Sequence, residues 1–132
     1  MEQITVVTND NVGALADISY ILGKAKINID SLSTVALSGK AVLVFFIKNA
    51  RRAKTVLENN GYTVLESEVL VLKLKDEPGQ LSKMSSLLSK QKINILNLYF
   101  IARDGGKSVV ALRVDKYTKA KRLLKPYLDL DD

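Results

Sequence analysis

The chain has 132 residues, of which 47% are hydrophobic and 26% are charged, and only two are proline. This is the composition of a folded soluble protein, and the length suits one domain or two units of about 65 residues. Cysteine and histidine are absent, which excludes disulfides, zinc ribbons, Cys or Ser-His nucleophiles and imidazole general bases. A net charge of +6 favours an acidic partner without identifying one.

No segment has the pattern of a membrane helix or of a secretion signal. The longest apolar run, residues 41–47, is as long as a strand and ends at Lys48, whereas a membrane helix needs roughly 20 apolar residues. The N-terminus lacks a basic stretch followed by an apolar one. We therefore expect a cytoplasmic protein that does not span a membrane.

The first half of the chain predicts the order strand, helix, hairpin, helix, strand. Alternating residues predict the strands, and apolar residues at helical spacing predict the helices. A Ser-Gly-Lys turn joins the hairpin, and Gly61 ends the second helix. In chain order the predicted elements cover residues 3–8, 14–25, 29–37, 41–47, 50–60 and 62–66.

The second half repeats the first at an offset of 66 residues. Two segments align most clearly: Asp10-Asn11-Val12-Gly13-Ala14-Leu15 with Asp76-Glu77-Pro78-Gly79-Gln80-Leu81, and Lys26-Ile27-Asn28-Ile29 with Lys92-Ile93-Asn94-Ile95. One extra residue, which we place in the turn at residues 104–107, shifts the offset to 67. The last strand of the copy would fall at residues 127–130, which are short and acidic, so we expect a weak fourth strand there.

The repeat divides the chain into two units, residues 1–68 and 69–132. The element order of each unit is βαββαβ, which predicts an antiparallel sheet with both helices on one face. The predicted fold class is therefore α+β, with two tandem ferredoxin-like units.

The loop between the first strand and the first helix is the candidate site in each unit. Asp10 or Asn11 can cap the first helix, and Gly13 leaves free N–H groups at a positively polarised helix end. Such an end binds anions, for instance the carboxylate of an amino acid. A purely structural explanation stays open, because Asp-x-Pro-Gly also starts a helix, with Pro78 favoured at the first helical position.

Asn28 and Asn94 lie between the first helix and the second strand of their units. The simplest role for either is a left-handed residue that ends the helix. If the second strand lies close to the first, the amide could also reach a ligand at the glycine loop, accepting from an ammonium group or donating to a carboxylate. Both alternatives stay open at this point.

The paired order of Asp-x-x-Gly-x-Leu, an apolar helix and Lys-Ile-Asn-Ile resembles the ACT domain, twice over nearly the whole chain. The arrangement is similar to stand-alone tandem ACT proteins with no attached enzyme. ACT domains are regulatory modules of amino-acid-metabolic enzymes such as phosphoglycerate dehydrogenase and aspartate kinase. The resemblance implies effector binding between ACT units, with these ligand-binding residues: Asp10, Asn11, Val12, Gly13, Ala14, Leu15, Asn28, Asp76, Glu77, Pro78, Gly79, Gln80, Leu81 and Asn94.

The first half departs from the ACT pattern, with Val12 in place of proline, and Asp30-Ser31 differs from Leu96-Asn97. These differences indicate that the two pockets are not alike. Neither the amino acid nor the copy that binds it follows from the sequence.

From the resemblance we predict an allosteric sensor of a free amino acid, which is not an enzyme and needs no cofactor or metal. We expect a homodimer that acts on an amino-acid-metabolic enzyme in trans. An ACT assembly module without a ligand is the main alternative. An RNA-binding protein of the same strand order is a weaker one, because the strand at 109–114 lacks the aromatic residues that stack on bases. A hydrolase would need an arginine beside the first strand, and none occurs before Arg51.

Overall fold

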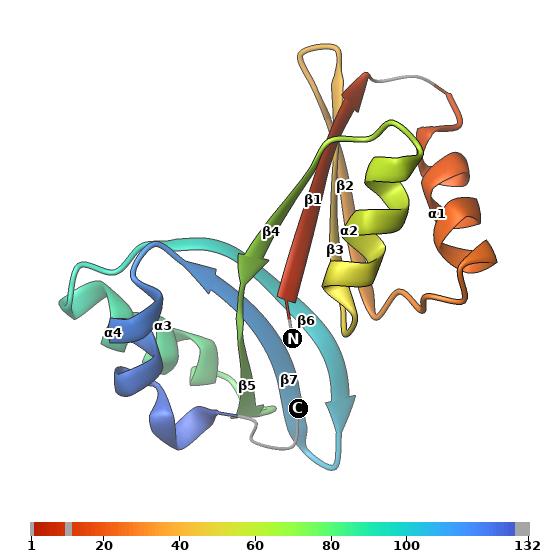
Figure 1. Ribbon diagram of the computed structural model, residues 1–132. Coiled ribbons are helices and arrows are strands. Elements are labelled where there is room, and N and C mark those ends of the chain that lie inside the picture. The colour runs from red at the N-terminus through yellow and green to blue at the C-terminus, as the bar shows by residue number, and fades with distance from the viewer. Residues whose placement is uncertain (1, 10–11, 129–132) are drawn as a thin grey trace. The chain divides into compact units, whose positions relative to one another are not determined.

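The computed structural model describes residues 2–9 and 12–128. The chain forms two compact units, Met1–Ser67 and Glu68–Asp132, and each is described by itself. Both begin with the order strand, helix, hairpin, helix, and in both the helices cover one face of an antiparallel sheet (Figure 1). This confirms the fold class predicted from the repeat.

The first unit contains a four-stranded sheet in the order β2-β3-β1-β4. The elements are β1 (Glu2–Asn9), α1 (Ala14–Lys24), β2 (Ser31–Leu37), β3 (Lys40–Ile47), α2 (Ala50–Asn59) and β4 (Val64–Glu68). Strand β3 is central and pairs antiparallel with β1 and with β2. Ile18 and Leu22 of α1 and Leu57 of α2 are fully buried against Ile4 and Phe45 of the sheet, so the predicted apolar stripes form the core.

The second unit contains a sheet in the order β5-β7-β6. Its elements are β5 (Leu70–Lys75), α3 (Gln80–Lys90), β6 (Ile95–Asp104), β7 (Lys107–Val114), α4 (Tyr117–Leu123) and the 3-10 turn η1 (Lys125–Tyr127). Met84 and Leu88 of α3 pack with Leu72 and Leu112 in its core. In the described ranges, no helix is long and apolar enough to cross a membrane.

The fourth strand predicted at residues 127–130 is reduced to one antiparallel bridge, between Leu128 and Leu72. Tyr127 belongs to the preceding 3-10 turn, where Pro126 has no N–H to offer to a ladder. Residues 129 and 130 lie outside the described part of the chain. The expectation of a weak strand agrees with the bridge that is seen.

The extra residue of the second copy lies in strand β6, which corrects its placement in the turn. Both hairpin turns have the same length, because Leu37 pairs with Lys40 and Asp104 pairs with Lys107. The register instead shifts between Phe100 and Ala102, as a β-bulge does when it adds one residue to one strand. The register therefore aligns Arg103 with Ala36 of the first unit.

Three helices end in the same hydrogen-bonded pattern, the Schellman motif. The N–H groups of Ile27, Tyr62 and Ile93 donate to carbonyl groups five residues earlier, at 2.9, 3.1 and 3.0 Å. The residue before each has a positive φ: 58° at Lys26, 90° at Gly61 and 58° at Lys92. Gly61 was predicted to end α2.

The simplest role predicted for Asn28 and Asn94, as left-handed residues at the helix ends, is wrong. Lys26 and Lys92 hold those positions, two residues earlier. Helix α1 ends at Lys24, and the left-handed residue must follow directly after the Ala25 cap for the motif to close. The asparagines therefore belong to the connection into the next strand.

Lys26→Gly should raise the free energy of unfolding by about 0.5 kcal/mol. A left-handed φ costs roughly 1 kcal/mol for a residue with a Cβ, and glycine removes this cost. Part of the gain is offset by the greater chain entropy of glycine in the unfolded state and by the loss of a positive charge at the helix end. Lys24→Gly is the matched control, because it removes the same charge from a right-handed position and should lower stability by about 1 kcal/mol. Urea unfolding of both variants tests this, and equal losses would contradict the left-handed assignment.

Tyr62 links α1 to the start of β4, since its hydroxyl donates to the Asp17 carboxylate. This hydrogen bond, with burial and the negative charge of Asp17, raises the pKa of Tyr62 from 10.0 to about 12. Because the pKa is raised in the folded state, the stabilisation is complete below pH 10 and is lost as the pH rises through about 12.

Tyr62→Phe should therefore lower the free energy of unfolding at neutral pH by about 0.5 kcal/mol, a small value because the pair is accessible to solvent. The difference from the wild type should vanish as the pH approaches 12. Asp17→Asn is the complementary variant, because it removes the carboxylate that accepts from the Tyr62 hydroxyl. A difference that stays constant across this pH range would show that the hydroxyl does not supply the effect.

Candidate functional site

Both candidate loops lead into a helix through a left-handed glycine. Gly13 is the N-cap of α1 with φ 98°, and Gly79 is the N-cap of α3 with φ 87°. A glycine cap has no side chain to accept from the first N–H groups of the helix. In α3 the Gln80 N–H donates to the Glu77 carbonyl at 3.4 Å, so the N–H groups that follow it are the ones a ligand can use. The predicted capping residues Asp10 and Asn11 lie outside the described residues. The structural explanation of the motif placed Pro78 at the first helical position, and this is wrong, because Pro78 precedes the Gly79 cap.

In the second unit, the loop forms one side of a pocket of about 400 Å³. All six loop residues predicted from the sequence line this pocket: Asp76, Glu77, Pro78, Gly79, Gln80 and Leu81. Five further residues complete the lining: Leu74, Lys75, Phe100, Arg103 and Ser108. The Asp76 N–H donates to the Gly106 carbonyl at 2.8 Å, which ties the loop to the β6–β7 turn. The pocket therefore lies between the start of α3 and one end of the hairpin.

The pocket carries both signs of charge. Arg103 Nε lies 3.9 Å from Asp76 Oδ1, and the guanidinium lies 5.8 Å from the centroid of the Phe100 ring. Lys75 and Glu77 add a second cation and a second carboxylate to the lining. Such a site can hold an anionic and a cationic group of one small molecule at the same time.

In the first unit, the equivalent pocket of about 480 Å³ is neutral among its described lining residues, which are Gly13, Ala14, Leu15, Ala16, Ser19, Thr34, Ala41 and Leu43. Three predicted residues, Gly13, Ala14 and Leu15, are among them. Val12 does not line the pocket and is fully exposed. The two loops thus share a backbone arrangement and differ in the chemistry around it.

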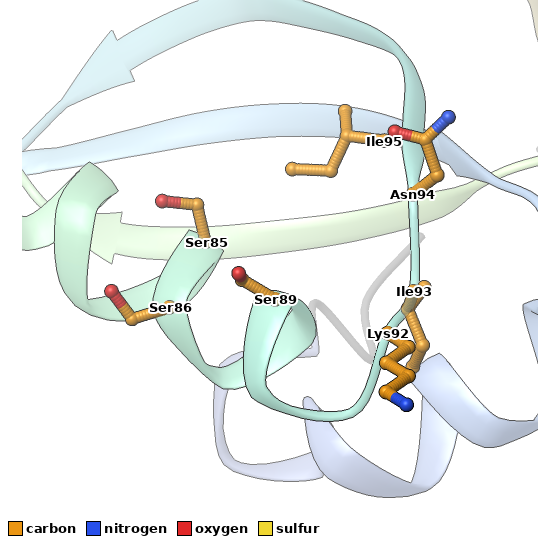
Figure 2. Close-up of a pocket in the computed structure, with 7 residues that line it drawn as sticks. All are labelled: Ser85, Ser86, Ser89, Lys92, Ile93, Asn94 and Ile95. Carbon is orange, nitrogen blue, oxygen red and sulfur yellow. The ribbon is translucent and has the colours of Figure 1, made fainter.

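Asn28 and Asn94 are not brought to the glycine loop of their own unit. Asn94 lines a separate pocket of about 580 Å³, where Ser85, Ser86 and Ser89 of α3 face the start of β6 (Figure 2). Its backbone is held by Asp115, whose carboxylate accepts from the Asn94 N–H at 2.9 Å. Asn28 lines a pocket of about 230 Å³ that does not include Gly13.

The suggestion that these asparagines reach the loop assumed that the second strand lies close to the first. Strand β3 lies between β1 and β2, and α1 separates Gly13 from Asn28. Within one unit, the asparagine and the glycine loop therefore do not share a site. Across residues 2–9 and 12–128, no group of three or more Asp or Glu is placed to hold a metal ion.

Sequence reasoning missed Phe100, Arg103 and Ser108. No motif marks them, because they belong to the hairpin and approach the loop only through strand pairing and the bulge in β6. The sequence does place Phe100 three residues before Arg103. That spacing indicates a shared site only once the structure shows that both side chains lie on one face of the sheet.

Comparison with known proteins gives a consistent result. The sequence profile of the ACT domain pair matches residues 1–129. A comparison with curated proteins found no match. Protein BT0572 from Bacteroides thetaiotaomicron is similar in structure, with TM-score 0.86 and 22% identity over 95% of this chain and 86% of that chain.

The regulatory subunits of aspartate kinase are also similar in structure. The ligand-free subunit from Thermus thermophilus has TM-score 0.67 and 19% identity, over 95% of this chain and 91% of that chain. The subunit from Thermus flavus has TM-score 0.67 and 17% identity, over 95% of this chain and 90% of that chain. At these identities the likeness establishes the fold.

Proposed function

Because this chain belongs to the ACT domain pair family, we propose that its two units form a regulatory module that binds a free amino acid and has no catalytic role. The observation that carries the proposal is the pocket at Gly79, where a helix start and cationic side chains lie beside two carboxylates. A zwitterion needs a site for its carboxylate and a site for its ammonium group within a few ångströms of each other. Its carboxylate would dock at the start of α3, and its ammonium group at Asp76 or Glu77.

The size of the pocket supports a ligand of this class. About 400 Å³ lies within the range of roughly 300–1,000 Å³ that small-molecule sites occupy. An ACT module that only assembles with another protein would not require charges of both signs around a free helix start. This arrangement therefore favours the sensor over the assembly module.

We further propose that the regulated partner is an amino-acid-metabolic enzyme in trans and that the chain forms a homodimer. The similarity to regulatory subunits of aspartate kinase supports a partner of this kind. Leu81 and Phe100 line the pocket and are 42% and 49% exposed, which gives a second chain an apolar surface beside the ligand. Amino acid binding would then change how chains pack and so change the activity of the partner.

In a thermal shift experiment with each of the twenty proteinogenic amino acids, at least one should raise the melting temperature. A ligand that binds only the folded state stabilises it by RT ln(1 + [L]/Kd), about 2.7 kcal/mol at a hundredfold excess over Kd. The assembly module without a ligand makes the opposite prediction, since no amino acid would shift the transition.

Gly79→Val and Gly13→Val should each abolish any binding that occurs at its own loop and leave the fold intact. An added Cβ would meet no atom within 4 Å at either position, so no clash results, but valine is strained at these positive φ values and the loop must move. Gly61→Val is the matched control, with φ 90° and equally open space at the end of α2. Wild-type affinity in both loop variants would exclude the loops as the site.

A further inference from the structure

We propose that the amino acid binds in the second unit only, and that Ser108 and Arg103 hold its carboxylate together with the first turn of α3. This inference rests on the proposed function and names the copy and the residues that carry it. The two residues are cross-strand partners on β7 and β6. The equivalent pair in the first unit is Ala41 and Ala36, which are also partners.

Ser108 provides a hydroxyl group to the pocket of the second unit. It is 3% exposed and lines the pocket, and its Cα is paired with that of Leu74, a member of the apolar core. No hydrogen bond joins its hydroxyl to any other residue that the structure describes. The hydroxyl is not among the buried side-chain atoms that lack a partner, so it is accessible through the pocket and can donate there, which the methyl group of Ala41 cannot do. A carboxylate in the pocket would supply the missing acceptor.

Arg103 is placed over the same pocket by the bulge in β6. In a regular strand Phe100 and Arg103, three residues apart, would point to opposite faces. The extra residue between Phe100 and Ala102 brings them to one face, where the guanidinium lies over the ring. Its contact with Asp76 is long and exposed, so it contributes little and leaves the guanidinium free to bind a carboxylate.

The charge at the helix start separates the two units as well. The first turn of α1 contains Asp17, whose negative charge opposes a second anion at that helix end. The first turn of α3 has no acidic residue, and Lys83 stands at the position that aligns with Asp17. Three differences, Ser108 for Ala41, Arg103 for Ala36 and Lys83 for Asp17, favour an anion in the second unit, and one, Glu77 for Asn11, opposes it.

Isothermal titration calorimetry with the full chain tests this assignment. Each of the twenty proteinogenic amino acids serves as a probe, together with the amide of any that binds and with inorganic phosphate. We expect one amino acid per chain, no binding of the amide, and no competition by phosphate at equal concentration. Binding of the amide as tightly as the acid, or of phosphate in its place, would overturn the carboxylate assignment.

Two variants exchange the key residues for those of the first unit. Ser108→Ala and Arg103→Ala should each weaken binding roughly tenfold or more, because each removes a hydrogen bond to a charged group. Ala41→Ser and Arg122→Ala are the matched controls and should bind as the wild type does; Arg122 is exposed on α4 and lines none of the pockets described. Arg103 is 69% exposed, so its variant should fold normally even if Ser108→Ala is unstable.

The outcomes separate the two levels of the proposal. If no amino acid binds the wild type, the proposed function fails and this inference fails with it. If an amino acid binds but Ser108→Ala and Arg103→Ala retain full affinity, or if two amino acids bind per chain, only the assignment to the second unit is overturned. Loss of binding in Gly13→Val but not in Gly79→Val would place the site in the first unit.

Discussion

The first helix of each unit is enclosed between two residues with positive φ, and the geometry of the whole site depends on this. Gly13 and Lys26 flank α1, and Gly79 and Lys92 flank α3. Both helices therefore have eleven residues and a rise of about 16 Å. The left-handed start leaves N–H groups beside the sheet, and the left-handed end turns the chain back into the next strand. The glycine loop and the asparagine are thus held at opposite ends of one rigid element.

Duplication has preserved this frame in both copies while the side chains around it have diverged. The cores use equivalent positions, such as Ile18 with Leu22 in one unit and Met84 with Leu88 in the other. Around the loop, the first unit uses Asp17 for a hydrogen bond from Tyr62, whereas the second unit has a lysine at the aligned position. One copy has an acidic helix start tied to its own scaffold, and the other has a basic start with charged neighbours.

The sequence was sufficient for the fold because the repeat allowed each element to be read twice. Apolar spacing located the helices, and the Gly79 loop was found in full, since its residues are contiguous. Phe100, Arg103 and Ser108 could not be found this way, because strand register and a bulge bring them to the loop. The extra residue of the copy was placed in the turn, and only the pairing with β7 moves it into β6. The left-handed role given to the asparagines failed because lysine, a residue that rarely takes that conformation, holds it in both copies.

The hydrogen bond from the Asp76 N–H to the Gly106 carbonyl couples the loop to the hairpin turn. The hairpin continues into β6, which lies at the edge of the described sheet. An occupant that restrains the loop would therefore also restrain this edge strand. Such a strand is where another polypeptide can add by backbone pairing. The pocket is thus connected to the edge strand through one hydrogen bond, at a turn that contains two glycines.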